Sequence, residues 1–333
     1  MQSPFVALAP QDAQAHLVAL WTDVYVSCCF SESRLDRTAI CIRDGGLVDR
    51  SKHVNERNPR PLARERPVTE GSGVTVHGGV LGPLHLGASA SAESVAIAPK
   101  VRTVMAMLLV HADQVVPVHA FMRELWGEQP PATGLRTLQT YILNCRKTLS
   151  QLTGRPATYV AQEILVTGAG GYGLKSTHVR LDWLEFQRLK NLGTKALEEG
   201  DSAAGIELLD AALALWRGDA LVDTPEGPVL HSQRRFFEES RLDAIAIRAE
   251  AQIKAGLHQR AVTQLAVVTS EHTLHEGLQA QYIRALALGG RRAEALGVLR
   301  MLRTRLVSEI GIEPGAPLRE LQLAILKSES GAV

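Results

Sequence analysis

The chain has 333 residues, of which 45% are hydrophobic, and its mean hydropathy is close to zero. This composition is typical of a globular protein that is long enough for two packed domains. The 36 Lys and Arg residues nearly equal the 35 Asp and Glu residues, so the charge of the whole chain identifies neither a nucleic-acid partner nor a membrane partner.

The absence of targeting signals and the spacing of the cysteines exclude further classes of protein. No apolar run approaches the roughly 20 residues of a membrane span, and the N-terminus lacks the basic-then-apolar layout of a signal peptide. The four cysteines, Cys28, Cys29, Cys41 and Cys145, show neither a CxxC pair nor a zinc-site spacing with His. We therefore expect a cytoplasmic protein with reduced thiols, no metal site, no cofactor and no membrane partner.

The N-terminal segment, residues 1–78, gives no clear domain signal. It holds nine basic and nine acidic residues, and residues 51–73 are polar, charged and interrupted by prolines. We expect a poorly ordered N-terminal extension. The same composition fits a chain whose natural start is a GTG codon at Val68, Val74 or Val76, and both alternatives stand.

The pattern sharpens after this extension. Short apolar runs at 80–87 and 94–98, bounded by Gly, Pro and Ser, predict small antiparallel strands. Pro99 then opens a helix with an apolar stripe, because proline is favoured at the first helical position. A second amphipathic helix follows Pro117 and ends at Gly127.

A third helix is predicted within residues 130–152, and its two faces differ in chemistry. The expected buried face, with apolar positions three and four apart, consists of Leu135, Leu138, Ile142, Cys145, Leu149 and Leu152. The opposite face carries Arg136, Thr140, Leu143 and Lys147, flanked by Gln139, Asn144 and Arg146. A solvated face usually mixes acids with bases, yet this stretch contains no Asp or Glu.

A β-hairpin over about 158–175 completes the set of elements that we expect in residues 79–177. Strands, three helices and a terminal hairpin are typical of a winged helix-turn-helix, whose third helix lies in the major groove of DNA. The missing acids would then follow from function, because a carboxylate beside phosphates weakens binding. A solvated helix that lacks acids by chance is the alternative, and the order of the elements argues against it.

Two motifs that suggest other chemistry have simpler interpretations. The GAGGYG stretch at 168–173 matches GxGxxG, but the residues after it are strand-like rather than helical, so we expect a hairpin turn and no nucleotide site. His272 and His275 lie across a predicted helix boundary, and no third ligand is nearby in sequence, which favours a surface or capping role. Nothing resembles a pair of nucleophile and base, so we expect no catalytic residues and no enzyme.

Residues 178–330 are predicted to form a tetratricopeptide-like, all-α domain with a net charge near −2. The expected helices cover 181–199, 201–216, 230–255, 258–271, 275–289, 291–310 and 317–327. Gly200, Gly256 and Gly290 each precede a helix, and the last two are one 34-residue repeat apart. The interval from Gly200 to Gly256 is 22 residues longer than this repeat. Residues 217–230 and a longer helix account for the difference. The predicted fold class is thus mainly α with small β elements.

Several stretches in this order resemble the Streptomyces antibiotic regulatory protein family. They are KVRTVMAMLLVHADQVVPVHAFMRELWGEQPPATGLRTLQTYILNCRKTL, GGYGL, LDWLEFQRL, LALWRGDAL and SEIGIEPGAPLRELQLAIL, within residues 79–327. The resemblance implies an OmpR-type winged helix joined to a bacterial transcriptional activation domain. It further implies a pathway-specific activator of a secondary-metabolite cluster. Such an activator binds promoter direct repeats near the −35 region, with RNA polymerase holoenzyme and a second protomer on DNA as partners.

By position in the family pattern, the expected DNA contacts in the third helix are Arg136, Thr137, Gln139, Thr140, Leu143, Arg146 and Lys147. Arg and Gln suit base edges, Lys and Thr suit phosphates, and Leu143 suits a thymine methyl. Lys100 and Arg102 are expected to hold phosphates, and Tyr172 is expected to pack inside. The chain departs from the family at His119, Asn144 and Cys145. Asn144 replaces a basic side chain of the family pattern, and this loss would weaken or redirect DNA contacts.

A second hypothesis belongs to another class of protein. A helical-repeat scaffold could retain a winged helix that binds proteins and no specific DNA, because that fold also serves such roles. Sequence-specific retardation of DNA in a gel shift separates the two hypotheses. The activator is the primary prediction, with a location on the nucleoid.

Overall fold

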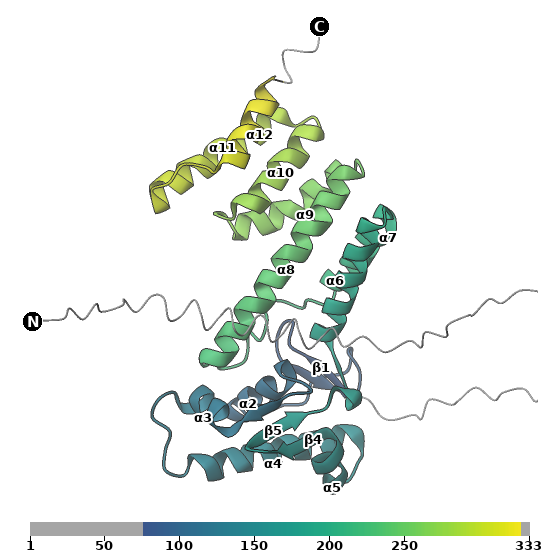
Figure 1. Cartoon of the computed structure of the whole chain (residues 1–333), viewed down its shortest axis with the longest axis vertical. Helices are drawn as coiled ribbons and strands as arrows, with labels where there is room; N and C mark the ends of the chain where they lie inside the picture. Colours follow the sequence, from purple (N-terminus) through teal and green to yellow (C-terminus); the bar gives the residue numbers. More distant parts are fainter. Residues whose placement is uncertain (1–75, 328–333) are drawn as a thin grey trace, which may run out of the picture. The chain divides into compact units, whose positions relative to one another are not determined.

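The computed structural model describes residues 76–327, so nearly all of the expected N-terminal extension lies outside the described residues. In the described part, strands and helices alternate up to about residue 181 and helices alone follow (Figure 1). None of the helices in this part is long and apolar enough to cross a membrane.

A small sheet opens the winged-helix domain and also closes it. Strand β1 (Val76–Gly79) pairs antiparallel with β2 (His85–Gly87) and parallel with β6 (Val179–Leu181). The prediction of a strand at 94–98 is wrong: this segment makes a single backbone–backbone bond to β2, from Val95 N–H to Leu86 O at 3.0 Å, and Leu86 N–H donates to the Ser94 hydroxyl at 3.1 Å. The side chains do alternate, with Val95 and Ile97 partly buried between exposed neighbours, but one backbone bond does not make a ladder, because the Ser94 hydroxyl takes the Leu86 N–H.

The first two predicted helices are present. Helix α2 (Pro99–Val110) has Pro99 in its first turn and is buried along most of its length. Helix α3 (Val118–Trp126) ends at Gly127, whose φ of 66° is in the left-handed region that glycine tolerates. Its N–H bonds to Arg123 O at 2.8 Å and closes the helix.

The third helix, α4 (Gly134–Thr153), confirms the two-faced pattern with one exception. Leu138, Ile142, Cys145 and Leu149 are buried and Leu152 is partly buried against the core, whereas Leu135 is 49% exposed. The prediction for Leu135 is wrong because it lies in the first turn. In this turn it is Gly134 that is buried, with the Met122 side chain close to it.

The hairpin is present but shorter than expected. Strands β4 (Leu165–Gly168) and β5 (Gly171–Leu174) form it, and β3 (Val115–Pro117) adds a third strand in the order β3-β5-β4. Residues 157–164, predicted in part as strand, are instead a short helix, α5 (Ala157–Tyr159), and one turn of π-helix, η1 (Val160–Ile164). Val160 and Ile164 are both buried, four residues apart, which is a helical spacing and not a strand spacing.

The helical domain follows the sequence prediction to within a few residues at most helix ends. After a short 3-10 turn, η2 (Ser176–His178), and β6 come α6 (Asp182–Glu198), α7 (Ser202–Leu213), α8 (Pro228–Lys254), α9 (His258–Glu271), α10 (Glu276–Leu288), α11 (Arg292–Arg305), η3 (Leu306–Ile310) and α12 (Ala316–Lys327). Consecutive helices pack on one another (Figure 1). Gly200, Gly256 and Gly290 all have positive φ, as helix-terminating glycines do.

The hydrophobic core does not divide where the two domains meet in sequence. Trp183, Phe186 and Phe237 of the helical domain belong to the same buried cluster as Phe121 and Leu138 of the winged helix. A separate cluster lies among the later helices, from α8 to α12. The start of the helical domain is therefore packed on the winged helix as one core.

Candidate DNA-binding surface

The outer face of α4 presents most of the predicted DNA-contacting side chains. Those of Arg136, Gln139, Thr140, Leu143 and Lys147 are exposed. Leu143 is half exposed although it is large and apolar, and the buried side of the helix faces the core. A surface leucine among polar and basic residues suits contact with an apolar base substituent such as a thymine methyl.

The charge around this face is one-sided. Residues 129–162, which contain α4 and the turns after it, carry four basic residues and no Asp or Glu. The basic side chains are Arg136, Arg146, Lys147 and Arg155. Such a surface attracts phosphate groups and presents no carboxylate to repel them.

Arg146 connects α4 to the hairpin. Its Nε donates to Leu165 O at 3.0 Å and its Nη2 donates to Thr167 Oγ1 at 2.9 Å, both on β4. A guanidinium has five N–H donors, so further donors are available for a ligand. Arg146 thus fixes the wing beside α4, and its role at DNA stays a prediction.

The two threonines of the predicted set bond to their own helix. Thr137 Oγ1 donates to Thr133 O and Thr140 Oγ1 donates to Arg136 O, each at 3.1 Å. A hydroxyl that donates to the preceding turn offers only its lone pairs to a ligand. To hold a phosphate, either hydroxyl would first have to rotate away from the helix.

Lys100 and Arg102 have partners within the protein that the sequence did not indicate. Lys100 Nζ donates to Leu125 O in the last turn of α3, at 2.8 Å. Arg102 Nη1 lies 3.1 Å from the Asp223 carboxylate and donates to the Asp223 backbone oxygen at 3.0 Å. Phosphate contact by these two residues stays a prediction, and it would compete with these bonds.

The glycines of the wing serve close packing. A side chain at Gly171 would overlap the backbone oxygen of Val116 on β3, and one at Gly168 would press on Val115. Gly170, with φ of 74°, makes the turn. Tyr172 is packed inside, edge-on to Phe121, as expected. The hairpin interpretation of the GAGGYG stretch is confirmed.

The other sequence candidates also have structural roles. His275 caps α10, with Nδ1 accepting from Leu278 N–H at 3.2 Å, which confirms the capping role. Burial raises the pKa of the Cys145 thiol to about 12, so this thiol is not a nucleophile at neutral pH. Within residues 76–327 there is no group of three His, Cys, Asp or Glu side chains placed to hold a metal ion.

Three carboxylates that were not singled out from the sequence contact backbone amides more than a hundred residues away in the described part of the chain. They are Glu124, Asp182 and Asp223. For Glu124 the sequence offered one signal, its place between Phe121 and Leu125 on the buried side of α3. A buried carboxylate there needs a hydrogen-bond partner. Asp182 begins α6 and accepts from Val80 N–H and Leu81 N–H at 2.9 and 3.1 Å.

Comparisons with known proteins agree with this architecture. Residues 92–171 match the model "Transcriptional regulatory protein, C terminal", and residues 181–326 match "Bacterial transcriptional activator domain". The chain is 41% identical to regulatory protein DnrI of Streptomyces peucetius, over 76% of this chain and 92% of that one. It is 34% identical to transcriptional regulator RedD of Streptomyces coelicolor, over 75% of this chain and 70% of that one.

A solved structure shares the fold. Mycobacterium tuberculosis EmbR, in complex with a low-affinity phosphopeptide, aligns with a TM-score of 0.68 and 31% sequence identity. The alignment covers 76% of this chain and 65% of that chain, so about a third of the neighbour has no counterpart in it.

Proposed function

We propose, because the chain belongs to the Streptomyces antibiotic regulatory protein family of transcriptional activators, that it activates one secondary-metabolite gene cluster. In this proposal it binds direct repeats near the −35 region of the promoter and recruits RNA polymerase holoenzyme. The observation that carries the DNA-binding part is the exposed, acid-free face of α4 beside a packed wing.

The residues of that face divide into two proposed roles. Arg136 and Gln139 are exposed near the N-terminal end of α4, which is the end that usually reaches base edges in this class of domain. Lys147 lies nearer the other end and suits a phosphate. The wing turn, residues 168–171, has no charged side chain, so its contact with the backbone would come from main-chain N–H groups.

The helical domain is the proposed contact for proteins. It is slightly acidic, with 19 basic and 21 acidic residues in 176–333, which makes it a poor surface for DNA. Stacked helix pairs of this kind commonly present grooves to protein partners. The proposed partners are RNA polymerase holoenzyme and a second protomer on the adjacent repeat, with the activator located on the nucleoid.

A gel shift and a transcription assay test the proposal. The full chain is mixed with promoter fragments from the genes that neighbour its own gene, with and without a fragment of shuffled sequence as competitor. We expect retardation that the shuffled fragment does not relieve, and transcripts from the same promoter that rise with purified polymerase. Absence of sequence-specific retardation even at low salt would contradict the proposal and favour the scaffold hypothesis.

A further inference from the structure

The connection between α7 and α8 is held by both domains. We call residues 217–230, which complete this connection and enter α8, the strap. Its backbone bonds to the start of the winged helix: Arg217 N–H donates to Leu81 O at 2.8 Å, and Leu221 N–H donates to Gly82 O at 2.7 Å. In the sequence the strap stands out as additional length between repeats, and its first residues belong to the LALWRGDAL stretch. The structure shows that it contacts residues more than a hundred positions earlier.

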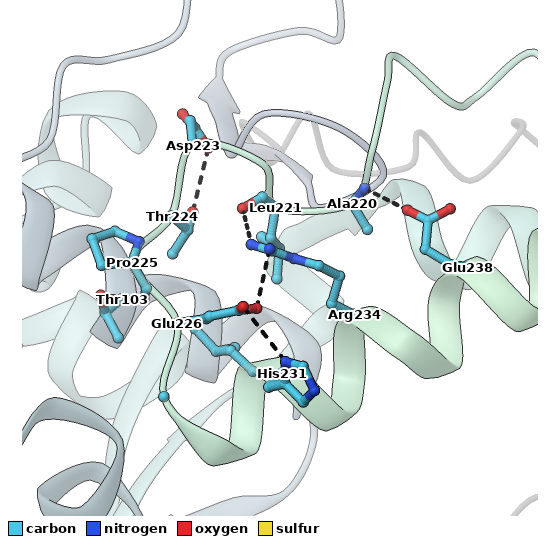
Figure 2. A network of polar contacts seen from close by, with 12 residues as sticks. Thr103, Ala220, Leu221, Asp223, Thr224, Pro225, Glu226, His231, Arg234 and Glu238 are labelled. Atoms are coloured by element: carbon cyan, nitrogen blue, oxygen red, sulfur yellow. Dashed lines mark hydrogen bonds and ion pairs between the residues drawn. The ribbon is translucent and has the colours of Figure 1, made fainter. Parts of the chain in front are cut away.

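Backbone and side-chain groups of the winged helix contact the middle of the strap. Asp223 accepts from Leu84 N–H at 2.7 Å through Oδ1, and its Oδ2 lies 3.1 Å from Arg102 Nη1. The buried hydroxyl of Thr103 donates to Pro225 O at 3.1 Å. Figure 2 shows Thr103 of α2 beside this part of the strap. A carboxylate that pairs with a cation and a backbone N–H fixes position as well as contributing energy.

Glu124 holds the end of the strap. Its carboxylate, which is 6% exposed by residue, accepts from Gly227 N–H at 2.6 Å and from Val229 N–H at 2.7 Å, with Leu230 N–H at 3.3 Å. These are free N–H groups at the N-terminus of α8, where a negative charge is favoured. A side chain at Gly227 would crowd the Glu124 backbone oxygen, so glycine permits this approach.

The helical domain holds the strap from its other side. Arg234 of α8 donates to Leu221 O at 2.7 Å and pairs with Glu226 at 3.1 Å, and Glu238 accepts from Ala220 N–H at 2.8 Å (Figure 2). Leu221 between them is fully buried with φ of 52°, an unusual conformation for a residue with a side chain. Such a conformation persists only where the surroundings fix it.

We propose that the strap is a clamp that sets the direction of α8 on the winged helix, and that Glu124 and Asp223 are positioning residues for activation. The inference rests on the proposed function. Helix α8 has 27 residues, about 40 Å, and it contacts α2 and α3 near its start and α9 and α10 farther along. A small change of angle at the clamp therefore moves the later helices by several ångströms relative to DNA-bound α4. Activation depends on the clamp, whereas recognition of the operator does not.

The test uses the full chain with Glu124→Gln and, separately, Asp223→Asn. Both changes keep the side-chain volume and one acceptor oxygen, but they remove the charge and turn one acceptor into a donor. The matched control is Glu294→Gln, whose carboxylate pairs with Arg291 within the start of α11. For each variant, three quantities are measured: hydrogen exchange of the amides of residues 226–231, affinity for the operator, and transcript yield with purified polymerase.

We expect exchange at Gly227, Val229 and Leu230 to rise at least tenfold in Glu124→Gln, operator affinity to stay within twofold, and transcript yield to fall at least fivefold. Asp223→Asn should lower the yield in the same direction, and the control should match the wild type. If a variant shows faster amide exchange but wild-type transcript yield, the clamp proposal is wrong and the proposed function stands. The same holds if operator affinity falls in parallel with transcript yield. A wild-type chain that activates no promoter overturns the proposed function and this role with it.

Discussion

At the scale of single residues, substitution of Lys147 tests the proposed contacts with DNA phosphates. Its ammonium group is exposed on α4 in an acid-free stretch, so Lys147→Ala should remove one counterion-releasing contact. We expect affinity to fall by a similar factor for all DNA sequences, and the slope of log affinity against log salt to decrease by about one. Titrations at several salt concentrations measure both. An unchanged slope would remove Lys147 from the binding surface.

Substitutions of Arg136 and Gln139 should have a different effect on DNA binding, because we propose that these exposed side chains contact base edges. Arg136→Ala or Gln139→Ala should relax the preference at particular base pairs, by about 1–3 kcal/mol each. Binding to a panel of single-base operator variants measures this. Arg300→Ala on α11 serves as the control that removes an exposed arginine elsewhere. If either α4 variant keeps the wild-type preference, the reading face has been misplaced.

Asp182 gives a prediction about pH. Burial raises the pKa of this carboxyl, against the opposing bonds from Val80 and Leu81 N–H and from Arg217. A folded-state pKa above the unfolded value means that the group's stabilising effect is complete at low pH and is lost as pH rises through the folded pKa. The stability of the wild type relative to Asp182→Asn should therefore decrease as the pH rises above about 4, the ordinary pKa of an aspartic acid. Urea unfolding of both proteins at several pH values measures this difference in stability. A difference that increases with pH would contradict the prediction.

At the scale of elements, local signals predicted the helices and the wing hairpin and failed at strands whose partners are distant in sequence. The helices from α6 to α12 could be placed from periodicity and from stops such as Gly256 and Gly290, because both signals lie within one segment. The three-residue strands β3 and β6 have no such signal. β6 is a strand because it pairs with β1, about a hundred residues earlier, and β3 because it pairs with β5. Non-local pairing of this kind is not visible in one stretch of sequence.

The wing gives a prediction at the same scale. Gly171→Ala would place a Cβ against the Val116 oxygen and push β3 from β5, so it should lower the free energy of unfolding by about 1–3 kcal/mol. The control is Gly297→Ala on α11, where the added Cβ meets nothing within 4 Å. That change should raise stability by about 0.5–1 kcal/mol because alanine favours helix. Urea unfolding compares them, and equal effects would contradict the packing argument.

At the scale of the whole molecule, the α4 face was predictable and the connection between domains was not. The face follows from spacing and from missing acids within twenty residues of sequence. Glu124 and Asp223 act through amides 103 and 139 residues away, so their roles appear only when the chain is folded. The same holds for the core, where Phe237 packs with winged-helix residues across the expected boundary at 177.

The last prediction divides recognition from activation between fragments of the chain. Residues 71–333 should bind and activate like the full chain, because the family match and the expected domains lie within them. Residues 71–181 should bind the operator more weakly and not activate transcription, since they keep α4 and the wing but lose the helical domain.

The end of the short fragment matters, because β6 completes the sheet at Leu181 by pairing with β1. A fragment ending at residue 177 lacks that strand and should unfold at a lower temperature than the one ending at 181, which circular dichroism can measure. If the fragment of residues 71–181 is folded, its transcript yield with purified polymerase shows whether the helical domain is needed for activation. If residues 71–181 activate as well as residues 71–333, the helices after Leu181 are not the activation surface. Their function must then be sought in assembly or in sensing a ligand.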